Sequence, residues 1–515
     1  MGERVPAALL SSLAEYVAEQ LGLDFPEKRL PDLERGLVAA AHELDIEGAE
    51  AFALSIIAAD ATDEQIQKFV SRLTVGETYF FRDRPSFEVL EQQILPALIA
   101  DRAREERRLR IWSAGCCTGE EPYSIAILLA KLIPNLRDWN ILILGTDINA
   151  AALRHASAGA YRDWSFRETS PQIRNRYFSQ TANGMWQIIP EIRQLVAFSF
   201  LNLAKDLYPS LETNTNCMDI LLCRNVLMYF LPDKVPPVIE KLHRALSPNG
   251  WLFVSPSEAT HTLFARFATA DFPDAIVFQK NDAANHPHPL RAKPGVSDAP
   301  AAAVPETAAA SRKPSPQVEI ALNAEKLQPK TAVAAASNSP GDYEQAQELF
   351  TNGSPVKAEE MALRMADRGD DPRACTLMTR ICADQGRLRE SLGWSERAIA
   401  IDKLNPAYRY LQATVLNEIG EIDAAIQALR HTLYLDPAHI LAHFTLGNLL
   451  KRAGKREGSE VHYRNALLLL EGTADESALP DSDGLTAGQL MAAIRAARLQ
   501  LSDRGSRGGA SGIGD

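Results

Sequence analysis

A short loop, SAGCCTGEEPYS, places two adjacent acidic side chains, Glu120 and Glu121, at the expected start of a helix. Its alanine and glycines would let a ligand come close to the backbone. A helix N-terminus usually favours an anion, but here two carboxylates already supply negative charge. The loop is therefore poorly suited to a diphosphate and better suited to a positively charged ligand without phosphate. The alternative is that the acidic pair only complements the helix dipole.

The spacing of Thr118 and Glu121 predicts how the same helix begins. A threonine followed three residues later by a glutamate is typical of a capping box. This spacing suggests that Glu120 faces the ligand while Glu121 caps the helix. The neighbouring Cys116 and Cys117 are interpreted as packing residues, because small apolar cysteine is a common filler.

Two further residues stand where apolar strands are expected to end. Asp147 closes NILILGTD, a position where an acidic residue in nucleotide-binding sheets accepts hydrogen bonds from ribose hydroxyls. Asn225 closes MDILLCRN, which lacks the [DNS]-P-P-[YF] motif of enzymes that methylate bases or amides. S-adenosylmethionine, with a sulfonium, an ammonium and no phosphate, fits this set better than NAD or ATP. A solvent-exposed aspartate at a strand end is the alternative for Asp147.

The elements that must position these residues follow from the hydrophobic pattern. Residues 108–281 alternate apolar strand-like runs with helical ones, which predicts a doubly wound, mostly parallel, Rossmann-like α/β domain. We place this domain at residues 91–282, with a small antiparallel β insert at about 160–200. Apolar spacing of three and four in residues 1–90 predicts a small all-α N-terminal domain.

The C-terminal part is predicted to be a helical repeat array. Gly386, Gly420 and Gly454 are spaced by 34 residues, the period of the tetratricopeptide repeat (TPR). About three and a half repeats fit residues 342–471, and stacked repeats of this kind form a solenoid that binds protein partners.

Two segments flank this array. Residues 283–340 are rich in alanine and proline and poor in aromatics, which predicts a disordered linker. Residues 472–515 are predicted to be a flexible tail with one possible helix. With such a linker between two modules, we expect that the repeats can be deleted without loss of cofactor binding.

Composition limits the class of protein and of partner. The 515 residues carry a net charge of −12, which argues against a nucleic-acid partner. Neither a signal peptide nor an apolar run long enough to span a membrane is evident, and the six cysteines form no C-x-x-C motif. A cytoplasmic location is therefore expected. The histidines show no metal-ligand spacing, so no metal site is expected.

The motifs taken together resemble a known family. TVGETYFFRD, SAGCCTGEEPYSIAI, GTDIN, FLNL and LCRNVLMYF are similar, as a set and in order, to the CheR family of chemotaxis receptor methyltransferases. The similarity spans about residues 10–281, and the fusion to TPR repeats resembles the WspC-like members of alternative chemosensory systems. The resemblance implies S-adenosylmethionine-dependent methylation of glutamate side chains on the cytoplasmic helices of methyl-accepting chemoreceptors, with membrane contact only through the receptor.

The resemblance also implies a set of site residues. Arg82 would position a carboxylate with its planar, bidentate guanidinium. Tyr229 would border the reacting atoms, or be a buried tyrosine with a hydroxyl partner. Gly76 stands where the family usually has asparagine, so one cofactor hydrogen bond of the family is not expected. The implied cofactor contacts are Thr78, Arg82, Ala114, Glu120, Asp147, Ile148, Asn202, Leu203, Asn225 and Val226.

Charge in the N-terminal helices departs from the family pattern. Residues 1–75 hold six Lys/Arg against fourteen Asp/Glu, so electrostatic steering toward an acidic receptor helix would be weak. Either the receptor surface is less acidic, or docking falls to the β insert, which is rich in arginine and aromatic residues, or to the repeats.

Two other functions stay open at this level. The first is a TPR scaffold with a vestigial methyltransferase domain, and the second is a carboxyl methyltransferase with a non-receptor substrate. Intact Glu120, Asp147 and Asn225 favour an active enzyme.

Overall fold

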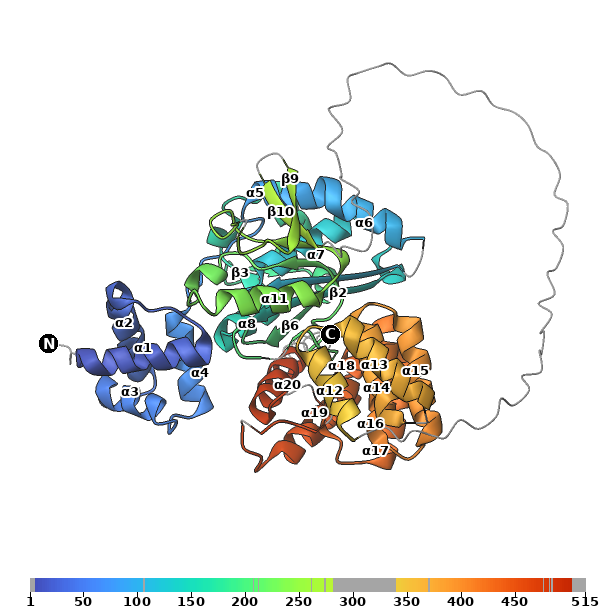
Figure 1. Ribbon diagram of the computed structural model, residues 1–515. Helices are drawn as coiled ribbons and strands as arrows, with labels where there is room; N and C mark the ends of the chain where they lie inside the picture. The colour runs from blue at the N-terminus through green and yellow to red at the C-terminus, as the bar shows by residue number, and fades with distance from the viewer. Residues whose placement is uncertain are drawn as a thin grey trace, which may run out of the picture.

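The computed structural model divides into an N-terminal helical part, a sheet domain and a C-terminal helical array (Figure 1). Residues 281–339 are not among the described residues, and they contain almost all of the predicted linker. The glycine-rich end of the chain is not described either. The structure describes residues 5–104, 107–206, 208–211, 213–260, 262–272, 275–280, 340–368, 371–475, 477–480, 482 and 485–502.

Four helices form the N-terminal part, which has its own apolar core. The hydrophobic pattern predicts three of them and does not single out the short α3. Thr62 and Gln65 form a complete capping box at the head of the last helix. The helices are α1 (Ala7–Leu21), α2 (Leu30–Glu43), α3 (Ala49–Ile57) and α4 (Asp63–Leu73).

A connector of about ten residues leads from α4 into the sheet domain. Phe80 of this connector is fully buried in the core of the sheet domain, not in that of the N-terminal helices. A continuous helical run follows, made of α5 (Arg84–Val89), the π-helical turn η2 (Leu90–Ile94) and α6 (Leu95–Arg102). We therefore propose a domain boundary near residue 74, earlier than the expected 90.

The central sheet has seven strands among the described residues, in the order β6-β2-β1-β7-β8-β10-β9. The first five are parallel, while β10 runs antiparallel to both neighbours. This confirms the predicted doubly wound α/β domain. The strands are β1 (Arg108–Ala114), β2 (Asn140–Asp147), β6 (Val196–Phe200), β7 (Met218–Leu222), β8 (Leu246–Phe253), β9 (Phe267–Phe272) and β10 (Ala275–Lys280).

Helices cover both faces of this sheet, so the central strands β1 and β7 are buried on both sides. Along β1, Ile111 packs into the cluster that includes α7 (Glu120–Leu132), and Trp112 packs into the cluster that includes α11 (Val235–Ala245). The helix α8 (Ala150–Ala158) follows β2.

The insert between β2 and β6 forms the predicted small antiparallel sheet, in the order β3-β5-β4. Its strands are short: β3 (Ala160–Tyr161), β4 (Phe178–Gln180) and β5 (Trp186–Ile188). A short helix, α9 (Pro171–Tyr177), lies between β3 and β4 in the chain.

The C-terminal array consists of four helical hairpins and a final helix, half a repeat more than predicted. Gly386, Gly420 and Gly454 take positive φ angles at the turns inside three hairpins, where the chain needs glycine. The helices are α12 (Pro340–Thr351), α13 (Pro355–Arg368), α14 (Pro372–Asp384), α15 (Leu388–Ile401), α16 (Pro406–Ile419), α17 (Ile422–Leu435), α18 (Ile440–Arg452), α19 (Arg456–Leu470) and α20 (Ala487–Ser502).

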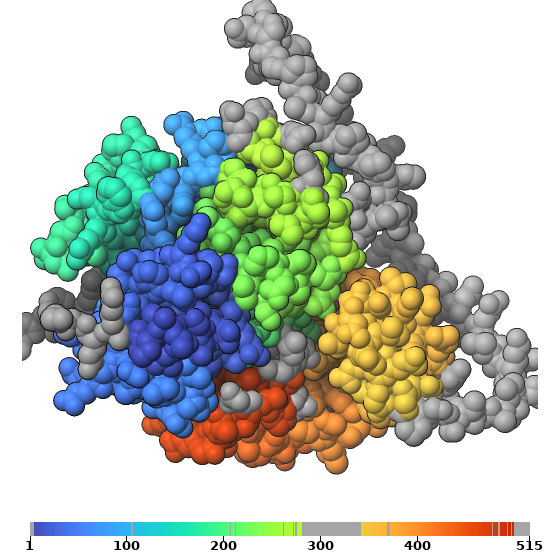
Figure 2. Space-filling model, turned by 60° about the vertical axis from the view of Figure 1, so that its left-hand side comes forward, coloured from blue at the N-terminus to red at the C-terminus, as the bar shows by residue number. Residues whose placement is uncertain are grey.

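The array lies against the sheet domain (Figures 1 and 2). The turn glycines Gly386 and Gly420 abut Cys217 and Asn140 of the sheet domain. Leu211, in the loop before β7, packs among apolar residues of α14, α15 and α16. No helix in the described part of the chain is both long and apolar enough to cross a membrane.

Candidate functional site

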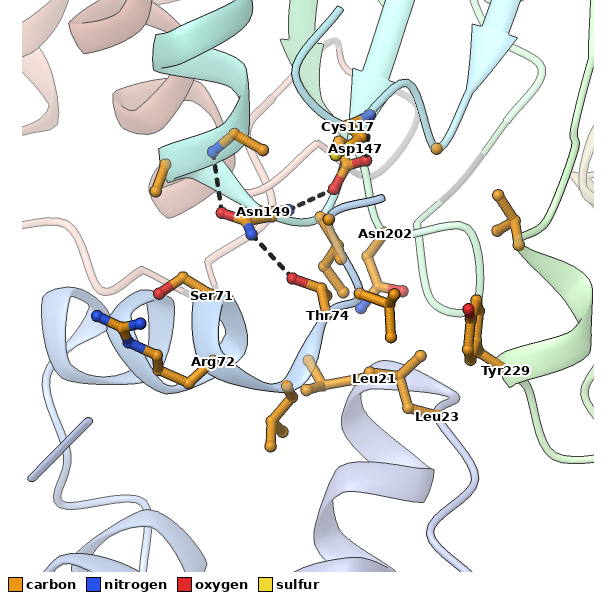
Figure 3. A pocket seen from close by; sticks show the side chains of 18 of the residues that line it. Leu21, Leu23, Ser71, Arg72, Thr74, Cys117, Asp147, Asn149, Asn202 and Tyr229 are labelled. Carbon is orange, nitrogen blue, oxygen red and sulfur yellow. Dashed lines mark hydrogen bonds between the residues drawn. The ribbon is translucent and has the colours of Figure 1, made fainter. Parts of the chain in front are cut away.

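A cavity of about 510 Å³ lies between the N-terminal helices and the carboxyl edge of the sheet (Figure 3). Ser71 to Gly76 form one wall, from the end of α4 into the connector. The loops after β1, β2, β6 and β7 form the opposite wall. Ligands bind at this edge of doubly wound sheets, outside the carboxyl ends of the strands. Seven residues from the predicted set line the cavity: Asp147, Ile148, Asn202, Leu203, Asn225, Val226 and Tyr229.

Asp147 at the end of β2 joins two of these loops. Its Oδ2 accepts from the backbone N–H of Cys117 and its Oδ1 from that of Asn149, both at 2.8 Å. Burial raises the pKa of Asp147, and the hydrogen bonds from Asn149 and Cys117 oppose the shift. Each carboxylate oxygen has a further lone pair, so Asp147 can still accept from a ligand.

Asn149 ties the N-terminal connector to the sheet. Its Nδ2 donates to Oγ1 of Thr74 at 2.8 Å, and its Oδ1 caps α8 by accepting from the N–H of Ala152 at 3.0 Å (Figure 3). This pair holds the two walls of the cavity at a fixed separation. An asparagine at this position suggests a helix cap, but nothing in its local sequence indicates the link to Thr74.

Asn202 is buried at the end of β6 and uses its side chain within the protein. Its Nδ2 donates to the carbonyl of Gln20 at 2.9 Å, and its Oδ1 accepts from the N–H of Ala204 at 3.0 Å. The N–H of Asn202 donates to Asp206 Oδ2 at 2.6 Å. Asn202 therefore joins α1 to the sheet and also lines the cavity.

Asn225 takes a left-handed conformation with a φ of 56°. Glu258 holds it there, because its carboxylate accepts from the N–H groups of Asn225 and Val226 at 2.8 Å and of Met228 at 3.2 Å. Glu258 is buried in the loop after β8. The hydrophobic pattern did not indicate this role, since a glutamate in SPSEAT looks like an ordinary loop residue.

The capping box predicted for α7 is wrong. The helix begins after Gly119, which has a φ of 90°, and neither predicted side chain caps it. Glu121 instead accepts from Ser113 Oγ at 2.7 Å and from Arg224 at 3.0 Å. Arg224 also donates to Asp83 and to the carbonyl of Arg82. The carboxylate of Glu121 therefore binds this buried arginine and does not cap the helix.

Glu120 lies just behind the cavity. Its carboxylate accepts from Thr118 Oγ1 at 2.6 Å and from Ser165 Oγ at 3.0 Å, and Thr118 itself lines the cavity. Burial raises the pKa of Glu120, and the hydrogen bond from Thr118 opposes that shift. The direct ligand contact of Glu120 stays a prediction.

The other predicted residues, Thr78, Arg82 and Ala114, do not line this cavity. Ala114 is buried at the end of β1, and Thr78 is half-buried in the connector. The guanidinium of Arg82 donates to the carbonyl of Glu77 at 2.5 Å and lies 5.9 Å from the ring centre of Tyr79. Their roles stay predictions.

Cys116 is buried beneath the loop, whereas Cys117 lines the cavity. Burial raises the pKa of the Cys117 thiol to about 12, with further contributions from Asp147 and Glu120. A thiol of this kind is a poor nucleophile at neutral pH. What Cys117 offers the site is its backbone N–H, which Asp147 accepts.

Basic residues gather on the outer lip of the cavity. Arg29, Lys68 and Arg72 line it, and Glu43 forms ion pairs with Lys68 and Arg72. Half of the six cations in residues 1–75 thus stand at this opening, although the region as a whole is acidic.

Comparison with known proteins identifies the family. Residues 76–276 match the family described as CheR methyltransferase, SAM binding domain. The chain is 37% identical over 214 residues to Chemotaxis protein methyltransferase 1 of Pseudomonas aeruginosa, which covers 41% of this chain and 76% of that protein. The chain belongs to the CheR family.

A second relative of this CheR protein extends into the repeats. It is 29% identical over 398 residues to the Probable biofilm formation methyltransferase WspC of Pseudomonas aeruginosa, covering 77% of this chain and 84% of that protein. Among solved structures, MamA aligns with 25% of this chain and 77% of its own at 21% identity, with a TM-score of 0.24. A score of that size says nothing about what the repeats bind.

The cavity suits S-adenosylmethionine, the cofactor of the CheR family. Its volume is within the range of about 300–1,000 Å³ for small-molecule sites. Its sheet-side wall carries Asp147, with Glu120 behind it, and the three cations that line the cavity, Arg29, Lys68 and Arg72, all come from the N-terminal part. This protein is therefore an S-adenosylmethionine-dependent methyltransferase.

Proposed function

We propose that this enzyme methylates glutamate side-chain carboxylates on the cytoplasmic domains of chemoreceptors, in a chemosensory pathway. Membership of the CheR family, together with a cavity at the carboxyl edge of its sheet, carries this proposal. Relatives named as chemotaxis protein methyltransferases support the receptor as substrate class.

Bound S-adenosylmethionine supplies an electrophilic methyl group on a sulfonium. A glutamate carboxylate is ionised at neutral pH, with an ordinary pKa near 4.3, so it needs no general base. The protein then has to hold the carboxylate oxygen, methyl and sulfur in line and exclude water. Closure of the cavity by α4 and the connector serves this purpose, since Asn149 and Thr74 fix the two walls.

Within this proposal the site residues divide the work. Asp147 accepts hydrogen bonds from the ribose hydroxyls of the cofactor, while Ile148, Asn202, Leu203, Asn225 and Val226 shape its pocket. Tyr229 borders the opening through which the carboxylate enters. Arg82, which lies in the connector, positions the carboxylate of the substrate or of the cofactor.

The substrate reaches the cavity from the lip that carries Arg29, Lys68 and Arg72. Since Glu43 already pairs with two of these cations, long-range steering by this lip is weak. We propose that the TPR array contributes by binding a protein partner, and that the enzyme works in the cytoplasm.

Radiolabelled methyl transfer tests the proposal. The full chain would be mixed with labelled S-adenosylmethionine and purified receptor cytoplasmic domains. Base-labile label on receptor glutamates is the expected result. Cofactor binding by calorimetry without any labelled receptor would contradict the receptor as substrate and favour another carboxyl substrate. Absence of cofactor binding would favour a scaffold with a vestigial domain.

A further inference from the structure

The last helix of the repeat array, α20, packs on the sheet domain as well as on α19. Its neighbours there are α8 and the edge strand β6 (Figure 1). Three residues of α8, namely Ala151, Ala152 and His155, line the cofactor cavity, and the loop after β6 supplies Asn202. The helix therefore lies directly behind two elements of the sheet-side wall of the cofactor site.

One side chain of α20 reaches a group that holds the cavity wall. Gln489 Nε2 donates to Oδ1 of Asp206, and Asp206 Oδ2 accepts from the N–H of Asn202. A single carboxylate thus links the repeat array to a cavity residue. Asp206 thus fixes the backbone of Asn202, while Gln20 and Ala204 hold its side chain.

A second contact reaches the opposite wall. Asp475, between α19 and α20, faces Asp63 at the start of α4, and burial together with this neighbouring carboxyl raises the pKa of Asp63 to about 6. The far end of α4 lines the cavity through Ser71 and Arg72. On the molecular surface the N-terminal helices and the C-terminal helices lie side by side (Figure 2). Asp475 and Gln489 therefore place the C-terminal helices against both halves of the site.

We propose that Gln489 is a positioning residue for the cofactor, and that α20 couples the repeat array to cofactor affinity. The proposal rests on the proposed function only in taking S-adenosylmethionine as the ligand. It replaces the expectation of two separable modules with a single unit, in which whatever moves α20 changes cofactor binding. By linkage, the cofactor must strengthen the docking of α20 to the same extent.

Charges around Asp206 limit the size of the effect. Lys205 and Lys241 also face this carboxylate, and Lys241 Nζ donates to the carbonyls of Leu203 and Asp206. Removal of the Gln489 donor leaves Asp206 with these cations but without the hydrogen bond that orients it toward Asn202. We therefore expect cofactor affinity to fall several-fold, with little change in the rate of methyl transfer from the bound cofactor.

Four substitutions in the full chain separate orientation from packing. Gln489→Met keeps the volume and removes the donor to Asp206, together with the Oε1 acceptor for the N–H of Thr486, which Gln489→Lys also lacks. Its Kd and KM for S-adenosylmethionine should rise ~5-fold with kcat within ~2-fold of wild type. Gln489→Glu adds a like charge beside Asp206, so it should bind S-adenosylmethionine more weakly than Gln489→Met does. Gln489→Lys restores a donor and should bind within ~2-fold of wild type. Arg498→Ala, on the same helix but paired with Glu460 of α19, is the matched control and should bind like wild type.

Hydrogen exchange supplies the reciprocal measurement. Addition of S-adenosylmethionine should slow exchange of the α20 amides in the wild-type chain and less so in Gln489→Met. Wild-type affinity in both Gln489→Met and Gln489→Glu would overturn the proposal, and so would an Arg498→Ala effect as large as theirs. If the wild-type chain itself bound no S-adenosylmethionine, the proposed function would fail, which is a distinct outcome.

Discussion

The two ends of the central strands use buried polar residues in opposite ways. At the carboxyl edge, Asp147 and Glu258 accept backbone N–H groups and hold loops around an open cavity. At the amino edge, Glu418 of α16 meets Arg108 and Arg110 of β1 in a closed interface. The first edge leaves capacity for a ligand, while at the second the carboxylate of Glu418 is enclosed by two arginines of the chain itself.

The amino edge behaves as an internal part of the fold. The side chains of Arg110 and Glu418 are 4% and 1% exposed. Asn216 donates to Glu418, Arg108 donates to the same carboxylate oxygen, and Asn140 donates to the carbonyl of Glu418. The repeat array is therefore held on the sheet domain by buried charge at the amino edge, whereas Asp475 and α20 bring it close to the cofactor site.

The largest effect is expected from Glu418→Ala. It leaves Arg110 buried without its carboxylate, and breaking a buried ion pair from one side costs about 3–5 kcal/mol. Urea unfolding should show this loss of stability, with a smaller change in cofactor affinity. Glu421→Ala, which breaks an exposed pair with Arg389, should cost under about 0.5 kcal/mol. A Glu418→Ala loss as small as that of Glu421→Ala would mean that the amino edge is not closed by charge.

Arg82→Ala should have the largest effect at the carboxyl edge. We expect kcat to fall ~100-fold, about 3 kcal/mol, because the substrate or cofactor carboxylate loses a bidentate partner. Stability should hardly change, because Arg224 contacts the backbone carbonyl of Arg82 and not its side chain. Arg84→Ala is the control, since Arg84 is exposed and paired with Glu88. Near-normal turnover would remove Arg82 from the mechanism.

The two edges also differ in how far the sequence predicts them. Asp147 and Asn225 follow apolar strands, so their place at one sheet edge is readable from local pattern. Glu418 and Arg110 lie 308 positions apart in the chain, and no local pattern pairs them. Glu121 shows the same limit, because T-x-x-E spacing predicts a cap while the distant Arg224 claims the carboxylate. The edge strands β6 and β9 escape prediction because small and polar residues interrupt them, so neither forms a continuous apolar run like those of the central strands.

Asp147→Asn tests whether the carboxylate holds the cofactor loops. Whichever way the amide turns, one of the N–H groups of Cys117 and Asn149 meets a donor instead of an acceptor. An unsatisfied buried donor costs about 2 kcal/mol, so the Kd for S-adenosylmethionine should rise ~30-fold in calorimetry. Asp138→Asn, in an exposed pair with Arg107 just before β2, should leave the Kd unchanged. Equal affinities in the two variants would contradict this role.

Asp206 gives a pH-dependent test of the contact between the repeat array and the cofactor site. Burial raises the pKa of Asp206 from 3.8 to about 6, against the hydrogen bond from Asn202 and the charge of Lys241. The folded state thus holds this proton more tightly than the unfolded chain, and stability falls as pH rises from about 4 to about 6.

Asp206→Asn removes that dependence. Relative to wild type, its free energy of unfolding should rise, meaning greater stability, by about 2 kcal/mol between pH 4.5 and pH 7.0. Urea titrations at the two pH values measure the difference, and Asp233→Asn in an exposed loop should show none. If the unfolding free energies of Asp206→Asn and wild type differed by the same amount at both pH values, the carboxylate of Asp206 would not be buried.

Cys117→Ala should have the smallest effect of all, although the residue lines the cavity. With a thiol pKa of about 12, only ~1 part in 30,000 is thiolate at pH 7.5, so no thiolate chemistry depends on it. The contact that matters is the backbone N–H to Asp147, which alanine keeps. The Kd for S-adenosylmethionine and kcat should stay within ~3-fold of wild type in calorimetry and methyl-transfer assays. A tenfold loss of kcat at unchanged Tm would give the thiol a role, and would add a side chain to an edge otherwise organised by carboxylates and backbone.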